Sequence, residues 1–141
     1  MEGACRKAHP NETGGMLFGE HVAEDTFRVA EATVAGAGSF ARFVRGLRNS
    51  LSRLEQFFHR TRHDYQRFNY LGEWHSHPHF VLRPSTEDDA TMSDTVNDPQ
   101  TNARFAVSLI IKLSDDALAV AGFVYYPGSD RENVEVVFDS G

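Results

Sequence analysis

Two apolar runs in the second half of the chain constrain the fold most, because segments of this kind must be buried. Residues 105–113 and 118–126 each have the length of a strand, and the polar residues 114–116 join them. Glycines interrupt an earlier apolar stretch at positions 14 and 15, which indicates a bend or a close approach of the backbone. In all, strands are predicted around residues 16–18 and at 27–34, 70–75, 105–113, 118–126 and 133–138.

Two helices are predicted between these strands. Apolar side chains recur every three or four positions over residues 40–58, which indicates a long helix that ends near His59 with Ser39 as its N-cap. The run 85–88 places an acid three residues after a serine, which is typical of a helix start, and we expect a short helix to about Val96. The order of elements favours an α/β or α+β fold in which these two helices flank one mixed central sheet.

The length of 141 residues fits one domain, placed here at residues 1–141. No apolar run approaches the roughly 18 residues that span a membrane, and residues 1–11 form a short lead-in without the apolar core of a signal peptide. Cys5 is the only cysteine, so an intramolecular disulfide is impossible, and it lies near a terminus expected to be loose. These features predict a cytoplasmic protein without a membrane partner. A thiol nucleophile at Cys5 is an alternative.

Charge is spread unevenly along the chain, whose net charge is -6. Seven arginines lie between Arg42 and Arg67, and five acids without a base lie between Ser85 and Asp98. The arginine run is typical of the solvated face of a helix, with binding to an acidic partner as the alternative. A nucleic-acid partner is not expected, because the net charge is negative and the neighbouring aromatic residues fit the apolar stripe and a loop.

The residues that carry chemistry follow the strand predicted at 70–75. His75 and His77 are two positions apart, and on extended backbone this spacing places both imidazoles on one face. Asp88 adds a carboxylate from the first turn of the next helix. Two histidines and one aspartate are the three protein ligands that a catalytic zinc ion uses, with a fourth position left open. A lone pair of histidines at this spacing is more often polar surface or core, so the pattern alone identifies no reaction.

Two motifs together resemble the JAMM (JAB/MPN) metallopeptidase family. His75-Ser76-His77, seven residues, Ser85, two residues and Asp88 match its HxH-x7-S-x2-D signature. The run 12–19 is similar to the family's ETGG-x-L-x-G segment and begins 63 positions before His75. The resemblance covers residues 12 to about 126 and implies a JAMM/MPN-type domain. It departs at the start, since members commonly have a strand and a helix before this segment and only eleven residues precede Glu12 here.

The resemblance implies a role for each matched residue. His75, His77 and Asp88 would bind one Zn²⁺ per chain, which lowers the pKa of a water molecule toward about 7. Glu12 would be the general base that accepts the proton from this water and later gives it to the leaving amine. Ser85 would hydrogen-bond the developing oxyanion. Ser85 is also a good helix N-cap, and the two roles are compatible.

Family members with an intact ligand set cleave peptide or isopeptide bonds after the C-terminal glycine of ubiquitin-like proteins. The implied partners are a ubiquitin-like protein or its conjugate, and E1-like and E2-like enzymes of the same operon. The compact size and the string Gly-Glu-Trp-His-Ser-His-Pro resemble bacterial members from antiviral operons, including CBASS. Alternatives are a non-catalytic MPN scaffold, a peptidase of sulfur-carrier or cysteine metabolism, and a DNA-associated protein of the RadC kind. The ETGG segment and the acidic net charge disfavour the RadC kind.

Three neighbours of the motif have open roles. Glu73 is expected to face away from His75 as a salt-bridge partner, with orientation of a ligand histidine as the alternative. Trp74 is predicted in the core, with a substrate wall as the alternative. His79, in the loop between the ligands, is expected to be exposed or to contact substrate, and ligation is its alternative.

Overall fold

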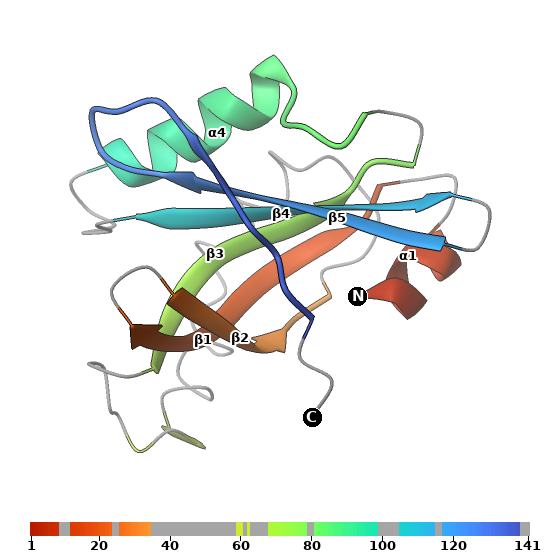
Figure 1. Ribbon diagram of the computed structural model, residues 1–141, viewed down its shortest axis with the longest axis horizontal. Coiled ribbons are helices and arrows are strands. Elements are labelled where there is room, and N and C mark those ends of the chain that lie inside the picture. The colour runs from red at the N-terminus through yellow and green to blue at the C-terminus, as the bar shows by residue number, and fades with distance from the viewer. Residues whose placement is uncertain are drawn as a thin grey trace.

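A computed structural model of the chain describes residues 1–8, 12–23, 26–34, 59–60, 62, 68–78, 81–98, 105–114 and 117–138. Within these ranges the chain forms one six-stranded sheet and two helices (Figure 1). The helices are α1 (Glu2–Ala8) and α4 (Thr86–Asn97). The strands are β1 (Gly14–Ala23), β2 (Thr26–Ala32), β3 (Phe68–Ser76), β4 (Ala106–Ser114), β5 (Ala117–Tyr125) and β6 (Glu132–Val134).

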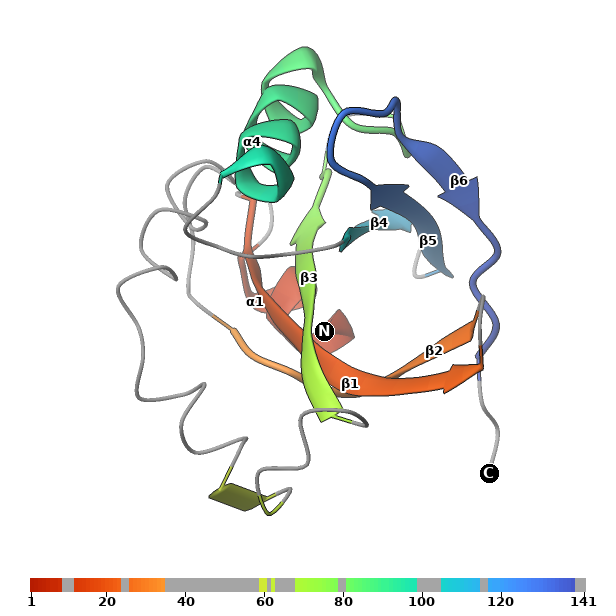
Figure 2. The same cartoon turned by 90° about the vertical axis from the view of Figure 1, so that its left-hand side faces the viewer.

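The sheet is mixed and strongly curled. Its order is β2-β1-β3-β4-β5-β6, and every neighbouring pair is antiparallel except β3 and β4, which run parallel. Parallel neighbours need a crossover connection, and here α4 lies within it. The end-on view shows β1 and β2 curling round toward the C-terminal segment, with α4 outside the curl (Figure 2). This topology puts the end of β3 directly before the helix that returns to β4.

Two apolar clusters pack on opposite faces of β4 because successive side chains of a strand alternate between its faces. Val107, Leu109 and Ile111 join a cluster that includes Cys5 of α1, whereas Ala106 and Ile110 join one that includes Met92 and Val96 of α4. The bulge between β1 and β3 near Gly72 lets Leu71 and Trp74 share the first of these clusters. One core therefore holds α1 and the other holds α4.

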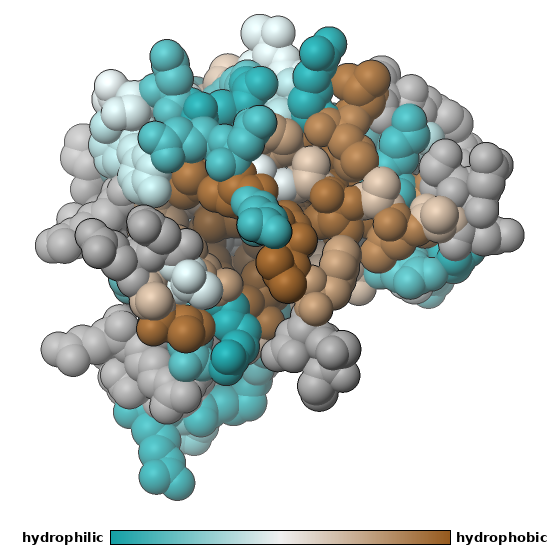
Figure 3. Space-filling model, in the orientation of Figure 1, coloured by the Kyte–Doolittle hydropathy of each residue, from teal (hydrophilic) through white to brown (hydrophobic). Residues whose placement is uncertain are grey.

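The expected class, an α+β domain around a mixed sheet, is confirmed, as are the short helix and its serine N-cap. Residues 35–58, which include most of the predicted long helix, lie outside the described residues. The predicted strand 133–138 is wrong in length, because pairing with β5 ends at Val134. Val137 and Phe138 beyond it are 77% and 67% exposed. Hydrophobic residues gather over β4, β5 and the segment that crosses them (Figure 3).

The structure at the start of the chain differs from the one expected from the sequence. Residues 2–8 form α1 rather than a lead-in, and Cys5 is only 5% exposed rather than part of a loose terminus. The Glu2 carboxylate pairs with Arg6 one helical turn later, which stabilises a helix of this length. Neither described helix has the length and apolar character to cross a membrane.

Candidate metal centre

The two candidate histidines leave the end of β3 on one face of the sheet. Although β3 ends at Ser76, the backbone N–H of His77 still donates to the Ile111 carbonyl of β4 at 2.9 Å. This bond continues the extended backbone for one more residue, so that the spacing of two places both rings together. His75 and His77 are 0% and 3% exposed.

Asp88 reaches the same place from the first turn of α4. Its Oδ2 lies 3.2 Å from Nε2 of His75 and 3.1 Å from Nε2 of His77, and the two Nε2 atoms are 2.9 Å apart. Among the described residues, these three form the group whose ligand atoms converge in the way a metal ion requires. The sequence expectation that they meet is therefore correct.

The donor set fits a zinc ion. A tetrahedral zinc with nitrogen and oxygen ligands at about 2.0–2.2 Å separates neighbouring ligand atoms by about 3.3–3.6 Å. The separations here are slightly smaller, so the three side chains need to open only a little. Two imidazoles and one carboxylate are also the chemical combination that catalytic zinc sites use.

Bonds outside the triad hold two of its members in orientation. Nδ1 of His77 lies 2.9 Å from the Val81 carbonyl and donates its proton there, which leaves the lone pair of Nε2 to face the other ligands. Oδ2 of Asp88 accepts the backbone N–H of Ser85 at 2.9 Å, and Ser85 Oγ in turn accepts the N–H of Asp88 at 3.1 Å. This reciprocal capping box fixes the start of α4 and the Asp88 carboxylate at once.

The electrostatics of the triad favour a cation. Burial alone would raise the pKa of Asp88, but hydrogen bonds from His75 and His77 outweigh it and hold that pKa well below its ordinary value. Burial lowers the pKa of His75, although Asp88 opposes this. For His77 burial also acts to lower the pKa, yet the bonds to Asp88 and Val81 raise it on balance. An ionised carboxylate beside two imidazoles attracts a positive charge, and a metal ion can supply it.

Glu12 lies just before β1, half-buried and within electrostatic reach of the triad. Burial raises the pKa of Glu12, His77 acts to lower it, and the carboxylates of Asp88 and Glu87 raise it further. The next residue, Thr13, is hydrogen-bonded through its backbone to Ser76 of β3. Segments more than 60 positions apart in the sequence are thereby joined, and the predicted base lies beside the predicted ligands.

Ser85 is exposed and acts as the N-cap of α4. Its Oγ accepts the Asp88 N–H, and this bond leaves the hydroxyl proton available. The capping role is confirmed, while the oxyanion role stays a prediction.

The neighbours of the motif have mixed outcomes. Trp74 is fully buried in the α1 cluster and donates its Nε1–H to the Thr33 carbonyl at 2.7 Å, so its core role is confirmed. The expectation that Glu73 faces away from His75 is wrong, because residues two apart on a strand share a face. Glu73 is buried and its Oε1 accepts from the Tyr70 hydroxyl. His79 lies outside the described residues.

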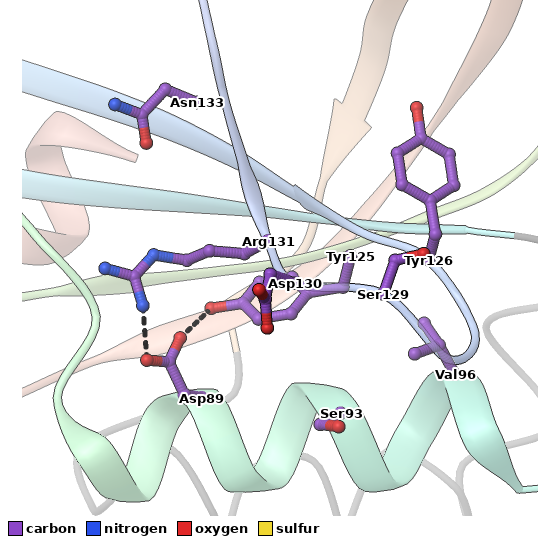
Figure 4. A pocket seen from close by; sticks show the side chains of 9 residues that line it. All are labelled: Asp89, Ser93, Val96, Tyr125, Tyr126, Ser129, Asp130, Arg131 and Asn133. Carbon is purple, nitrogen blue, oxygen red and sulfur yellow. Dashed lines mark hydrogen bonds and ion pairs between the residues drawn. The ribbon is translucent and has the colours of Figure 1, made fainter.

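A polar cluster on the flank of α4 was not anticipated from the sequence. It lies in a pocket of about 420 Å³ between α4 and the turn after β5 (Figure 4). Asp89, the residue after the candidate ligand, accepts from the Tyr125 hydroxyl at 2.7 Å and pairs with Arg131. Burial and the Asp89 carboxylate raise the pKa of Tyr125 well above its ordinary value, so the hydroxyl remains a donor. The cluster ties the first turn of α4 to β5, and since Asp89 and Arg131 are 42 positions apart no local pattern could reveal it.

Comparisons with known proteins agree with this geometry. The family model described as prokaryotic homologs of the JAB domain matches residues 3–138. A protein of Enterobacter hormaechei subsp. hoffmannii (strain UCI 50), named CD-NTase/cGAS isopeptidase, is 37% identical over 101 residues, which are 66% of this chain and 51% of that protein. The match therefore spans about half the length of this relative.

The chain was also compared with solved structures. A protein of Desulfitobacterium hafniense, solved in solution, superposes with a TM-score of 0.61 at 19% identity, over 99% of this chain and 86% of that one. A JAB1/MPN domain protein of Archaeoglobus fulgidus superposes with a TM-score of 0.43 at 20% identity, over 95% of this chain and 85% of that one. At such identities the first match shows that the two chains fold alike.

Proposed function

Because the chain belongs to the family of prokaryotic JAB-domain homologues, we propose that it is a zinc-dependent isopeptidase or peptidase acting after the C-terminal glycine of a ubiquitin-like protein. The observation that carries the proposal is the convergence of His75, His77 and Asp88 within 2.9–3.2 Å. Three protein ligands with an open fourth position are typical of catalytic zinc sites, whereas structural zinc sites use four.

The proposed chemistry divides between the ion and the chain. A zinc ion held by the triad would polarise the substrate carbonyl and make water more acidic. Glu12 accepts the water's proton on its carboxylate and passes it to the leaving amine. Its raised pKa suits this exchange, because a proton shuttle works best with a pKa near the working pH. Ser85 donates its free hydroxyl proton to the oxyanion.

The proposed substrate follows from the surroundings of the site. Residues 81–83 lie between His77 and Asp88 in the sequence. The Arg83 N–H donates to the Val81 carbonyl at 2.8 Å, which turns the backbone there. Val81 is 57% exposed there and offers an apolar wall to an extended tail. We propose that the substrate tail passes this wall to reach the metal centre, where glycine next to the cleaved bond is accommodated more readily than a bulky residue.

The relative's name supports a more specific setting. The relative is named an isopeptidase for CD-NTase/cGAS, and we propose that the present chain likewise removes a protein conjugated to an enzyme of this class. In this setting the chain works in the cytoplasm as part of bacterial antiviral defence, with E1-like and E2-like enzymes forming the bond that it cleaves. Genes for such enzymes beside its own gene would support the setting.

Cleavage of a matched pair of fusions tests the function. A ubiquitin-like protein is fused through its terminal glycine to a reporter, and a second fusion carries leucine in place of that glycine. We expect cleavage directly after the glycine, strong slowing by leucine, and loss of activity with a chelator that added zinc reverses. Glu12→Gln should lose at least about 100-fold of the activity while a residual rate remains measurable, and the exposed Glu132→Gln serves as its matched control. Equal rates for both fusions, or cleavage at another site, would reject the ubiquitin-like substrate.

A further inference from the structure

Ser76 stands between the two candidate ligands but faces the other side of the strand. Ser76 is 4% exposed and is hydrogen-bonded to Thr13, which is 1% exposed. The N–H of Ser76 donates to the Thr13 carbonyl at 2.9 Å, as in an ordinary antiparallel pair. The return bond is different, because the Thr13 N–H donates to Ser76 Oγ at 2.9 Å rather than to a backbone carbonyl. A side chain thus completes the last rung between β1 and β3.

The two bonds between Thr13 and Ser76 fix the path of the backbone just before β1. The peptide bond joins Glu12 to the backbone nitrogen of Thr13. Because Ser76 Oγ holds this nitrogen, it restricts the direction in which Glu12 leaves the strand. Thr13 is 1% exposed, so bulk water does not reach its N–H and the bond to Ser76 Oγ is costly to lose. The Ser76 hydroxyl therefore helps to hold the Glu12 carboxylate near His77 and Asp88, together with the backbone bond from the Ser76 N–H to the Thr13 carbonyl.

The ligands are also held from the side of β4, in addition to the pairing of His75 with Gly14 of β1. His75 pairs with Ile110 in the parallel ladder, and the His77 N–H donates to the Ile111 carbonyl, so β4 secures both residues. Asp88 is held by the capping box of α4. Loss of the Ser76 hydroxyl should loosen the Glu12 side of the site and leave the metal side in place.

We propose that Ser76 is a positioning residue that fixes Glu12 over the metal centre by binding the Thr13 backbone. Its effect on turnover rests on the proposed function, whereas the tether itself does not. A purely structural serine would lower stability and alter every property of the site alike. A positioning serine separates turnover from metal binding, since Ser76 holds Glu12 through Thr13, whereas β4 and the capping box of α4 hold the ligands.

The experiment compares Ser76→Ala with Ser76→Thr, which keeps a hydroxyl, and with Ser108→Ala, which removes a buried hydroxyl of β4 that makes no bond to Thr13. Amide hydrogen exchange at Thr13 is measured without substrate. We expect it to be at least about tenfold faster in Ser76→Ala than in the other two variants. Zinc content should stay at the wild-type level in all three. Unchanged exchange at Thr13 would overturn the tether.

Kinetics then test the catalytic consequence. A misplacement of about 1 Å can cost about 100-fold in rate, so kcat of Ser76→Ala should fall by about 10- to 100-fold with KM little changed, and Ser76→Thr should restore most of it. In a Glu12→Gln background, Ser76→Ala should have no further effect. Loss of zinc together with activity, or a full additional loss in that background, would overturn the positioning role. Absence of cleavage by the wild-type chain would refute the proposed function, while exchange at Thr13 still decides the tether.

Discussion

Gly15→Ala should destabilise the protein through one close backbone contact. A Cβ at Gly15 would lie 1.8 Å from the Thr33 carbonyl oxygen and 2.9 Å from Trp74 Nε1. The backbone at Thr33 must therefore move away. Three hydrogen bonds meet there. The Trp74 Nε1–H donates to the Thr33 carbonyl at 2.7 Å. The Thr33 N–H donates to the Met16 carbonyl, and the Met16 N–H donates to Thr33 Oγ1, both at 2.9 Å.

The magnitude follows from these bonds. At about 0.5–1.5 kcal/mol each, their loss should lower the free energy of unfolding by about 2–4 kcal/mol. With a urea m-value of about 1–3 kcal/mol/M, the midpoint should fall by about 1 M or more. Trp74 is the only tryptophan and is fully buried, so its fluorescence reports the transition. Chelator is present throughout, because bound metal would add to stability.

Gly3→Ala is the matched control. An added Cβ at Gly3 meets nothing within 4 Å, and Gly3 lies in α1, where alanine is favoured by up to about 1 kcal/mol. We therefore expect this variant to be unchanged or slightly more stable. If Gly15→Ala unfolds within about 0.5 kcal/mol of the wild type, the reasoning from the Thr33 contact is refuted.

The remaining predictions concern the metal, the base and the α4 cluster. Free zinc at about 100 times its Kd should stabilise the wild type by about 2.7 kcal/mol in scanning calorimetry, and the effect should vanish in His77→Ala; an equal shift in that variant would place the metal elsewhere. Elemental analysis of Glu12→Gln should find zinc at the wild-type level, because Glu12 is not a ligand, and its loss would make Glu12 one. Tyr125→Phe removes the bond to Asp89 but leaves Arg131 in place, so urea denaturation should show a loss of about 1 kcal/mol. No change would mean that Arg131 alone holds Asp89.

How far the sequence anticipates this structure depends on how local each feature is. The joint position of His75 and His77 follows from strand periodicity, and Ser85 with Asp88 follows from the capping pattern, so both could be predicted. The close approach at Gly15 was indicated by its place in an apolar strand. Features that join distant segments had no such signal, as with the bond from Thr13 to Ser76 and the pair between Asp89 and Arg131.

Propensity and periodicity also failed in two places. The helix at residues 2–8 is shorter than the usual range for isolated helices and forms because Cys5 packs on the sheet, which tertiary structure decides. The alternation at residues 133–138 predicted a full strand, but alternation shows only that a segment can pair, and pairing here ends at Val134.

The burial of Cys5 makes its thiol a built-in probe of local opening at α1. Cys5 is the only cysteine of the chain and lies, 5% exposed, on the face of α1 that packs against the sheet. Burial raises the pKa of its thiol, so a thiol reagent reaches a reactive form only when α1 detaches from the sheet. The rate of alkylation under native conditions therefore measures how often this helix detaches, without an engineered label. Leu17 and Trp74 of the same cluster lie on the strands that carry Glu12 and His75 toward each other. Slower alkylation of Cys5 on adding zinc would show that metal binding at the triad reduces the detachment of α1 from the sheet.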